Sequence, residues 1–229
     1  MASGICDADE LVTVRVDAAT QVSARWLAPP AARLCYVMAH GAGSGMDHPF
    51  MRAAASELAA HGVATLRYQF PYRERGSRRP DAPPVCHATV RAAVAAARRR
   101  APTAALFAGG RSFGGRMTSQ AQALSPLPAV RGLVFLGFPL HPAGSPGTER
   151  AAHLEHIALP MLFVQGSRDA LAQPALLEQV LQRLPTPATV HWIEAADHSF
   201  HVPARSGRTD TEVRRALLAQ AASWMAARV

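Results

Sequence analysis

Phe107-Ala108-Gly109-Gly110-Arg111-Ser112-Phe113-Gly114-Gly115 is the stretch that decides the fold, because it indicates a strand, a sharp turn and a helix in succession. Gly110, Ser112 and Gly114 match G-x-S-x-G, the nucleophile elbow, in which a serine occupies a strained turn between a sheet strand and a helix. Glycine on either side removes side chains that would collide with neighbouring backbone. The uncommon backbone geometry of the serine turns its hydroxyl away from the sheet. The stretch therefore makes Ser112 a candidate nucleophile.

The flanking residues decide between an elbow and an ordinary glycine-rich turn, since so short a pattern also occurs by chance. Residues 104–108 form an apolar run suited to a buried strand, and residues 117–124 can continue as a helix until Pro126 stops it. This context favours the elbow.

Length and composition predict one globular domain over residues 1–229. The chain has 229 residues, of which 49% are hydrophobic and 17% charged, which is enough for a substantial core. The formal charge is +8, and every basic residue other than histidine is arginine. The arginines are spread along the chain without a recognised nucleic-acid-binding motif, so no nucleic-acid partner is expected.

Cysteine use and the N-terminus predict a cytoplasmic protein. Cys6, Cys35 and Cys86 are few, odd in number and widely spaced, which argues against a disulfide framework. Cys35 lies in an apolar run and is best explained as a core residue. Residues 1–10 contain no apolar signal core, and no stretch approaches membrane-spanning length, so no membrane partner is expected.

The order of predicted elements indicates a doubly wound α/β sheet. Two strands of alternating apolar and polar residues open the chain and indicate an antiparallel pair at a sheet edge. Buried strands then alternate with helices. The predicted strands are residues 11–16, 21–27, 34–39, 63–68, 104–108, 132–137, 160–166 and 189–194. The predicted helices are residues 50–61, 85–100, 117–124, 149–157, 174–184 and 209–228, with an irregular loop over 69–84. Ligands of such sheets bind beyond the carboxyl ends of the strands.

Two residues that follow later strands can complete a catalytic triad with Ser112. Asp169 comes after the strand at 160–166, and His198 comes after the last strand. The order Ser112, Asp169, His198 is that of α/β-hydrolases. Asp169 has an alternative reading as a helix cap or turn former. Asp197 is a rival carboxylate, but its adjacency to His198 places it poorly to reach the far ring nitrogen.

An oxyanion hole is expected from two backbone N–H groups. One belongs to Phe113, at the start of a helix whose dipole favours negative charge. The second comes from the glycine-rich loop at 40–43, with Ala42 favoured and Gly43 as the alternative. His40 is interpreted as a loop-packing residue.

A dinucleotide-binding reading of this loop fails, because Met46 stands at the third glycine position and residues 67–70 lack the acidic ribose ligand. No cofactor is therefore predicted. Histidine pairs at 40 and 48, 153 and 156, and 198 and 201 lack partners at a recognisable ligand spacing, so no metal site is predicted. Asp47 is a candidate cap for the helix that follows it.

With these residues assembled, the chain resembles compact α/β-hydrolases related to dienelactone hydrolases. It is most similar to a predicted hydrolase family that includes a testis-expressed protein and a subunit of the non-specific-lethal histone acetyltransferase complex. The resemblance rests on residues 40–50, 70–73, 110–116 and 197–200. It implies a hydrolase fold and a serine triad without implying a substrate. Dienelactone hydrolases carry cysteine where Ser112 stands, so their lactone substrate does not transfer.

The sequence thus predicts a serine hydrolase that cleaves a small ester or thioester through an acyl-enzyme. The loop at 141–148 is too short for a lid domain. Arg73 and Arg75 could meet an acidic group of the substrate, although solvated surface arginines explain them more simply. The alternative function is a hydrolase-like protein-interaction module that turns over no substrate.

Overall fold

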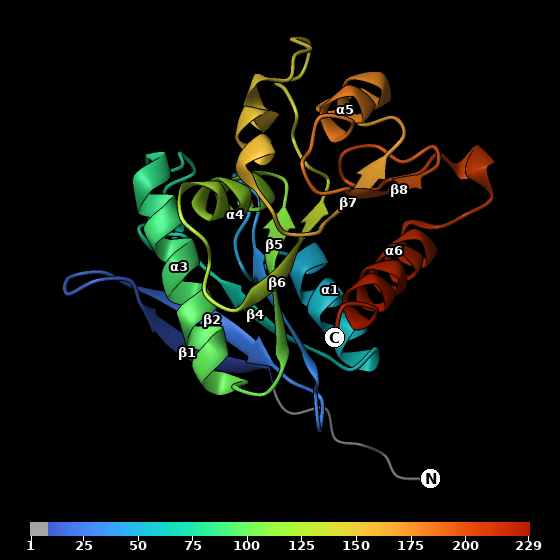
Figure 1. The fold of residues 1–229 in the computed structure, drawn as a ribbon. Helices are drawn as coiled ribbons and strands as arrows, with labels where there is room; N and C mark the ends of the chain where they lie inside the picture. Colours follow the sequence, from blue (N-terminus) through green and yellow to red (C-terminus); the bar gives the residue numbers. More distant parts are fainter. Residues whose placement is uncertain (1–8) are drawn as a thin grey trace, which may run out of the picture.

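A computed structural model describes residues 9–229, which form an eight-stranded sheet with helices on both faces (Figure 1). The strands are β1 (Glu10–Arg15), β2 (Gln21–Leu27), β3 (Leu34–Ala39), β4 (Val63–Tyr68), β5 (Ala105–Arg111), β6 (Val130–Leu136), β7 (Met161–Gly166) and β8 (Thr189–Ile193). Their spatial order is β1-β2-β4-β3-β5-β6-β7-β8. β2 pairs antiparallel with both β1 and β4, and the remaining pairs are parallel. The predicted α/β-hydrolase sheet with antiparallel N-terminal strands is confirmed.

Helices α1 and α6 cover one face of the sheet, and α3 and α4 cover the other (Figure 1). The α-helices are α1 (Pro49–Ala60), α2 (Pro71–Glu74), α3 (Pro83–Arg100), α4 (Phe113–Leu124), α5 (Pro174–Leu181) and α6 (Asp210–Ala226). The 3-10 helices are η1 (Glu149–His156) and η2 (Ala204–Ser206). Only a short segment separates β6 from η1, so the open sheet carries no lid domain within the described residues, as the sequence predicts.

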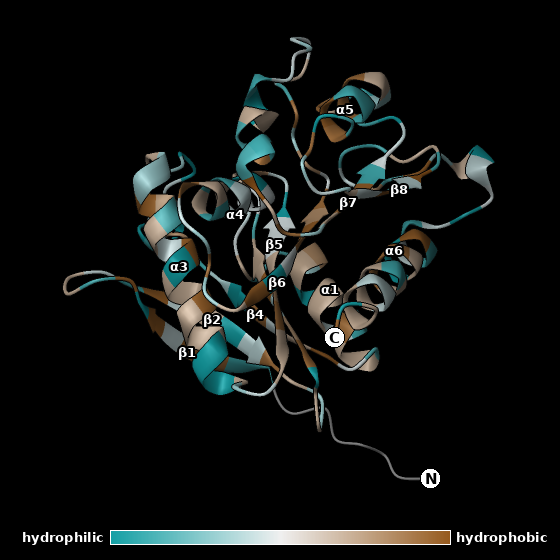
Figure 2. Cartoon of the chain, viewed as in Figure 1, coloured by the Kyte–Doolittle hydropathy of each residue, from teal (hydrophilic) through white to brown (hydrophobic). Residues whose placement is uncertain are grey.

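The core explains why the central strands are continuously apolar. All six residues of β3 are buried, and successive side chains point to opposite faces. Cys35 and Val37 belong to the cluster under α3 and α4, whereas Tyr36 and Met38 belong to the cluster under α1 and α6. The predicted core position of Cys35 is confirmed. Figure 2 shows the central strands mainly in brown and the C-terminal end of α3, which carries Arg98, Arg99 and Arg100, in teal.

Three local predictions differ from the structure. The loop expected over 69–84 contains α2, because Pro71 at the first helical position has a favourable φ and needs no hydrogen-bond acceptor. The helix expected over 149–157 is the 3-10 helix η1. Asp47 does not cap α1. Its carboxylate lies 3.4 Å from Arg25 Nε, and His48 Nδ1 accepts from Phe50 N instead.

Among residues 9–229, every helix is too short or too polar to cross a lipid bilayer. The prediction that the chain lacks a signal core concerns residues 1–10. Most of these residues, including Cys6, lie outside the described part of the chain.

Candidate active site

Ser112 sits at the junction of β5 and α4 in a backbone conformation that side-chain-bearing residues rarely adopt. Its φ is 50° and its ψ is −119°. The Ser112 N–H donates to the carbonyl of Leu136 on β6 at 3.1 Å, which ties the turn to the neighbouring strand. A residue with positive φ persists only where the surroundings hold it. The strain expected of a nucleophile elbow is therefore present at this serine.

The glycines of the G-x-S-x-G stretch allow the elbow to pack directly on the end of β3. A Cβ added at Gly110 would lie 2.2 Å from the Ala39 oxygen. A Cβ at Gly114 would lie 2.6 Å from both the Ala39 and the His40 oxygens. Such distances are far inside van der Waals contact. The approach of β5 to β3 therefore requires glycine at position 110, and the approach of α4 to β3 requires glycine at position 114.

The structure brings the three predicted triad residues together. His198 Nε2 lies 2.9 Å from Ser112 Oγ, and His198 Nδ1 lies 2.7 Å from Asp169 Oδ2. The Asp169 side chain is fully buried and that of His198 is 24% exposed. A carboxylate only accepts hydrogen bonds, so Nδ1 carries the proton and Nε2 is free to accept from the serine hydroxyl. This tautomer is the one a general base needs.

Asp169 is held on both of its oxygens. Its Oδ1 accepts from Leu171 N at 2.7 Å, and its Oδ2 accepts from the Gln165 amide in addition to His198. The Gln165 Oε1 in turn accepts from Phe138 N at 2.9 Å. Asp169 is thus both a turn former and the histidine's partner, so the two readings of this residue are compatible.

Gln165 was missed by the sequence reasoning, although a signal for it exists. It is a polar residue in the otherwise apolar strand β7, and it is fully buried. A buried amide must find partners for its N–H and its oxygen. Here those partners are the candidate catalytic carboxylate and the backbone that follows β6. Gln165 therefore orients Asp169 from behind.

The rival carboxylate, Asp197, accepts hydrogen bonds from the backbone of its own loop. Its Oδ1 accepts from Ser199 N at 2.7 Å and from His201 N at 2.9 Å. These bonds shape the turn that carries His198, and Asp169 is the carboxylate on the far ring nitrogen.

The loop after β3 is fixed by buried polar contacts. His40 Nε2 accepts from Phe70 N at 3.2 Å, and its Nδ1 lies 2.8 Å from the Gly41 oxygen. Burial lowers the pKa of His40 to about 4, so the ring is neutral near pH 7. The Tyr72 hydroxyl donates to the Ala42 oxygen at 2.8 Å. His40 and Tyr72 therefore hold the loop against the segment that follows β4.

Ala42 and Phe113 lie beside Ser112 and line the same cavity. Among the turn, loop and helix-cap hydrogen bonds of residues 9–229, none has the Ala42 N–H or the Phe113 N–H as its donor. The Phe113 N–H stands at the N-terminus of α4, where the helix dipole favours negative charge. A serine with an oriented base and two free donors beside it is the arrangement that nucleophilic acyl transfer requires.

The cavity over Ser112 has a volume of about 460 Å³. Its lining combines apolar residues of several loops with two arginines, and the residues are Ala42, Pro80, Asp81, Pro83, Ser112, Phe113, Arg116, Met117, Pro139, Arg150 and Leu171. The two arginines of the lining come from α4 and η1 and were missed by the sequence reasoning.

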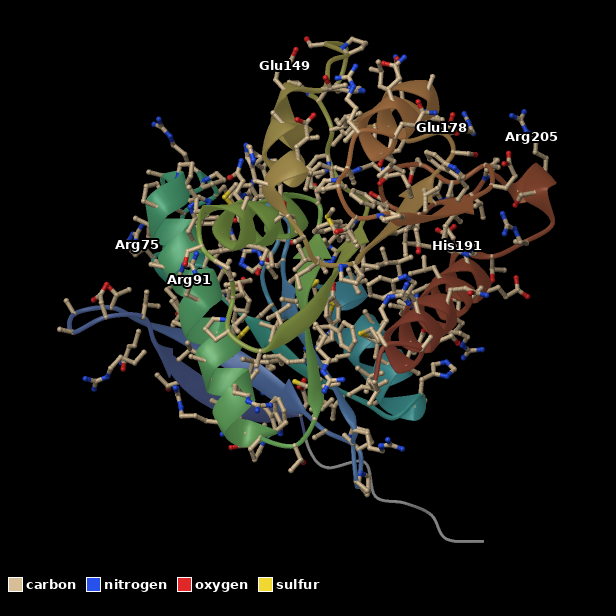
Figure 3. The ribbon with its side chains drawn as sticks, in the orientation of Figure 1. Arg75, Arg91, Glu149, Glu178, His191 and Arg205 are labelled. Carbon is tan, nitrogen blue, oxygen red and sulfur yellow. The ribbon has the colours of Figure 1, made fainter. Side chains whose placement is uncertain are left out.

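The arginines considered from the sequence are not part of that lining. Arg75 is 61% exposed and pairs with Asp81, and Figure 3 shows it at the edge of the molecule, beside α3. The Arg73 guanidinium donates to the Ser77 oxygen at 3.2 Å.

The histidine pairs weighed as metal ligands have other contacts. His201 Nδ1 lies 2.9 Å from Asp210 Oδ2, and His153 Nε2 lies 2.7 Å from Ser119 Oγ. In the part of the chain that the structure describes, no three His, Cys, Asp or Glu side chains gather in a way that could hold a metal ion.

A family model described as an alpha/beta hydrolase domain matches residues 32–226 of the chain. Because the match covers most of the sequence, the chain belongs to this family. The match spans all three triad candidates and the loop after β3.

Solved structures agree with this fold assignment. A dienelactone hydrolase from Anabaena variabilis has a TM-score of 0.75 at 22% identity, covering 96% of this chain and 97% of that chain. A serine hydrolase without a lid from Xanthomonas campestris has a TM-score of 0.71 at 21% identity, with 94% of each chain covered. Est1E from Butyrivibrio proteoclasticus has a TM-score of 0.70 at 14% identity, covering 95% and 99%. At these identities the likeness concerns the fold.

Proposed function

We propose that the protein is a serine hydrolase that cleaves a small ester or thioester through an acyl-enzyme, with Ser112, His198 and Asp169 as the triad. The observation that carries the proposal is the chain of contacts from Ser112 Oγ through the His198 ring to Asp169 Oδ2, at 2.9 and 2.7 Å, beside an open cavity. The N–H groups of Phe113 and Ala42 form the oxyanion hole. The reaction needs no cofactor and no metal ion.

The first half of the reaction forms the acyl-enzyme. Ser112 Oγ attacks the carbonyl carbon of the substrate while His198 Nε2 takes the hydroxyl proton, and Asp169 stabilises the resulting imidazolium. The carbonyl oxygen becomes an oxyanion that accepts from Phe113 N–H and Ala42 N–H. When the tetrahedral intermediate collapses, the bond to the leaving oxygen or sulfur breaks. His198 then gives its proton to the departing alcohol or thiol.

The second half repeats these steps with water as the nucleophile. His198 Nε2 takes a proton from water as the water oxygen attacks the acyl carbon. The collapse of the second intermediate returns the proton to Ser112 Oγ and releases a carboxylic acid. Both halves need the neutral ring of His198 at the moment of attack.

Further predictions on identity and location rest on the sequence. They are the closer relationship to the family of the testis-expressed protein, a cytoplasmic location, and small molecules as partners in place of nucleic acid or membrane. Purified protein mixed with nucleic acid or with lipid vesicles should remain unbound at physiological salt.

Labelling with a fluorophosphonate probe tests the proposal. The probe should label the native protein at Ser112, and Ser112→Ala should abolish labelling while His198→Ala slows it strongly. Ser119→Ala is the matched control, since it removes a serine of the same helix that also contacts a histidine, and it should be labelled normally. Absence of Ser112-dependent labelling would overturn the enzyme proposal and favour the non-catalytic interaction module. A panel of esters and thioesters with varied acyl length then measures the substrate preference.

A further inference from the structure

Two cationic side chains line the cavity over Ser112. Arg116 comes from α4, one helical turn after the serine, and Arg150 comes from η1. Proline residues and the side chains of Met117 and Leu171 make up much of the remaining wall. The cavity is thus apolar along its sides and positively charged at two points.

Neither arginine is neutralised by a carboxylate within the described part of the chain, residues 9–229. Other arginines there are paired, such as Arg100 with Glu10 and Arg214 with Glu57. The acidic residue of the lining, Asp81, is paired with Arg75 through Oδ1, and its buried Oδ2 has no hydrogen-bond partner among the described residues and is not within ion-pair distance of Arg116 or Arg150. The two cations of the cavity therefore have no such protein counter-ion.

Arg116 is more than a solvated surface cation. Its Nε is buried and has no hydrogen-bond partner in the structure. Its guanidinium lies over the Phe113 ring, 5.7 Å from the ring centre, and this contact restricts the orientation of the head group. Burial and, second to it, the charge of Arg150 lower the pKa of Arg116. Arginine nonetheless stays charged in proteins, so two neighbouring cations remain uncompensated.

An anionic ligand would give the Arg116 guanidinium a hydrogen-bond acceptor and would compensate the charge of the two arginines. A carboxylate or phosphate offers several acceptor oxygens to the planar donors of a guanidinium and supplies the missing negative charge. The fold also keeps the arginines near the nucleophile. Arg116 N donates to the Ser112 oxygen at 3.2 Å, and Ser112, Arg116 and Arg150 line one cavity of about 460 Å³. An anionic group that binds in this cavity is therefore only a short acyl chain away from the carbonyl that Ser112 attacks.

We propose that the preferred substrate of this site is an ester or thioester that carries an anionic group, a carboxylate or phosphate, a few bonds from the scissile carbonyl, where Arg116 and Arg150 bind it. The inference rests on the proposed function for the reaction at Ser112. It adds the charge and the approximate length of the substrate. Arg116 and Arg150 act as specificity-determining residues, while the triad performs the chemistry.

A pair of chromogenic esters of matched length tests the inference: the 4-nitrophenyl hemiester of succinic acid and 4-nitrophenyl butyrate. The native protein should favour the anionic ester, mainly through KM. Arg116→Met and Arg150→Met should each lower kcat/KM for the hemiester about tenfold or more while leaving butyrate within about twofold. Arg116→Lys should restore part of the loss. Arg52→Met, an exposed arginine on α1, is the matched control and should change neither rate.

The outcomes separate this inference from the proposed function. If Ser112-dependent hydrolysis occurs but both arginine variants keep the native ratio of the two rates, the anionic-substrate inference is overturned and the serine hydrolase stands. If neither ester is hydrolysed, calorimetric titration of the Ser112→Ala protein with monomethyl succinate measures the anion site without turnover. Binding that disappears in Ser112→Ala/Arg116→Met supports the inference, and absence of binding to Ser112→Ala overturns it.

Discussion

Helix α4 carries two serine–histidine pairs, and only one has the organisation of a catalytic site. Ser112 Oγ lies 2.9 Å from His198 Nε2 at the N-terminus of the helix. Ser119 Oγ lies 2.7 Å from His153 Nε2, two turns further on. The second distance is the shorter of the two. A serine oxygen within hydrogen-bond distance of an imidazole is therefore insufficient to identify a nucleophile.

The two pairs differ in which ring nitrogen carries the proton. Asp169 accepts from His198 Nδ1, which leaves Nε2 as the acceptor for the Ser112 hydroxyl. The Ser119 hydroxyl instead donates to the Arg116 carbonyl at 2.9 Å, an acceptor in its own helix. Both contacts of Ser119 are satisfied when His153 Nε2 carries the proton and donates to Oγ. The first histidine is then set up as a base, and the second as a donor.

The two serines also differ in backbone conformation and in solvent exposure. Ser112 has the left-handed φ of 50° and opens onto the cavity, whereas Ser119 lies inside α4 and is buried. The third partner, the backbone conformation and the exposure of the serine therefore distinguish the candidate site from the second pair.

The largest expected effect follows from removing the third partner. Asp169→Asn keeps the size of the side chain but replaces an acceptor with an amide that can favour the wrong tautomer of His198. We expect kcat to fall by about 10⁴-fold. Steady-state kinetics with the best ester of the panel measures the loss. His153→Gln, which alters the other pair, should stay within about threefold, and comparable losses in both variants would contradict the distinction between the pairs.

The close packing of α4 on β3 beside the first pair predicts a large effect on stability. In Gly114→Ala the new methyl group would lie 2.6 Å from the Ala39 oxygen, so β3 and α4 must separate. We expect the free energy of unfolding to fall by at least about 3 kcal/mol, the upper range for overpacking. Chemical denaturation measures the change. Gly43→Ala is the control, because no atom lies within 4 Å of its added Cβ and the cost should be small.

Much of this site could be predicted because its residues follow strands in a fixed order. Ser112, Asp169 and His198 each come just after a strand, and the carboxyl ends of parallel strands lie at one edge of a sheet. The apolar runs that define β5 and β7 were readable from local sequence. The same alternation of strands and helices therefore predicts both the fold class and the position of the triad candidates.

The residues that were missed depend on long-range packing. Arg150 reaches the cavity only because η1 lies against α4, and no local pattern announces that contact. The local sequence favours Asp47 as the cap of α1, and this prediction is wrong. The carboxylate pairs instead with Arg25 on β2, which is distant in sequence, so no local pattern could show the contact. Gln165 was visible as a polar residue in a strand, but its partner became clear only from the fold.

The second pair predicts a dependence of stability on pH. Burial, with Arg116 as a lesser cause, lowers the pKa of His153 from 6.5 to about 4. Between these values the unfolded chain binds more protons, so stability falls as the pH drops from 6.5 to 4 and levels off below. At about 1.4 kcal/mol per pH unit, His153 contributes no more than about 4 kcal/mol to this loss. His40, whose pKa burial also lowers to about 4, adds a loss in the same window.

Denaturant unfolding at a series of pH values measures this dependence. His153→Gln should flatten the profile between pH 6.5 and 4, because the His153 share of the proton uptake is gone, and the His40 share should remain. His61→Gln, at an exposed histidine after α1, is the control and should keep the native slope. An unchanged slope in His153→Gln would show that His153 is not held neutral by the fold.

The smallest effect is expected from Ser119→Ala, which removes the serine of the second pair. His153 Nε2 and the Arg116 carbonyl each lose a partner, and a hydrogen bond of this kind contributes about 1 kcal/mol. The greater helix propensity of alanine offsets part of that cost. Ester hydrolysis should stay within about twofold, and Ser112→Ala/Ser119→Ala should be no less active than Ser112→Ala. A hundredfold loss in Ser119→Ala, with the protein still folded by circular dichroism, would mean that the second pair takes part in the reaction. Neither the tautomer of the histidine nor the burial of the serine would then distinguish the two pairs.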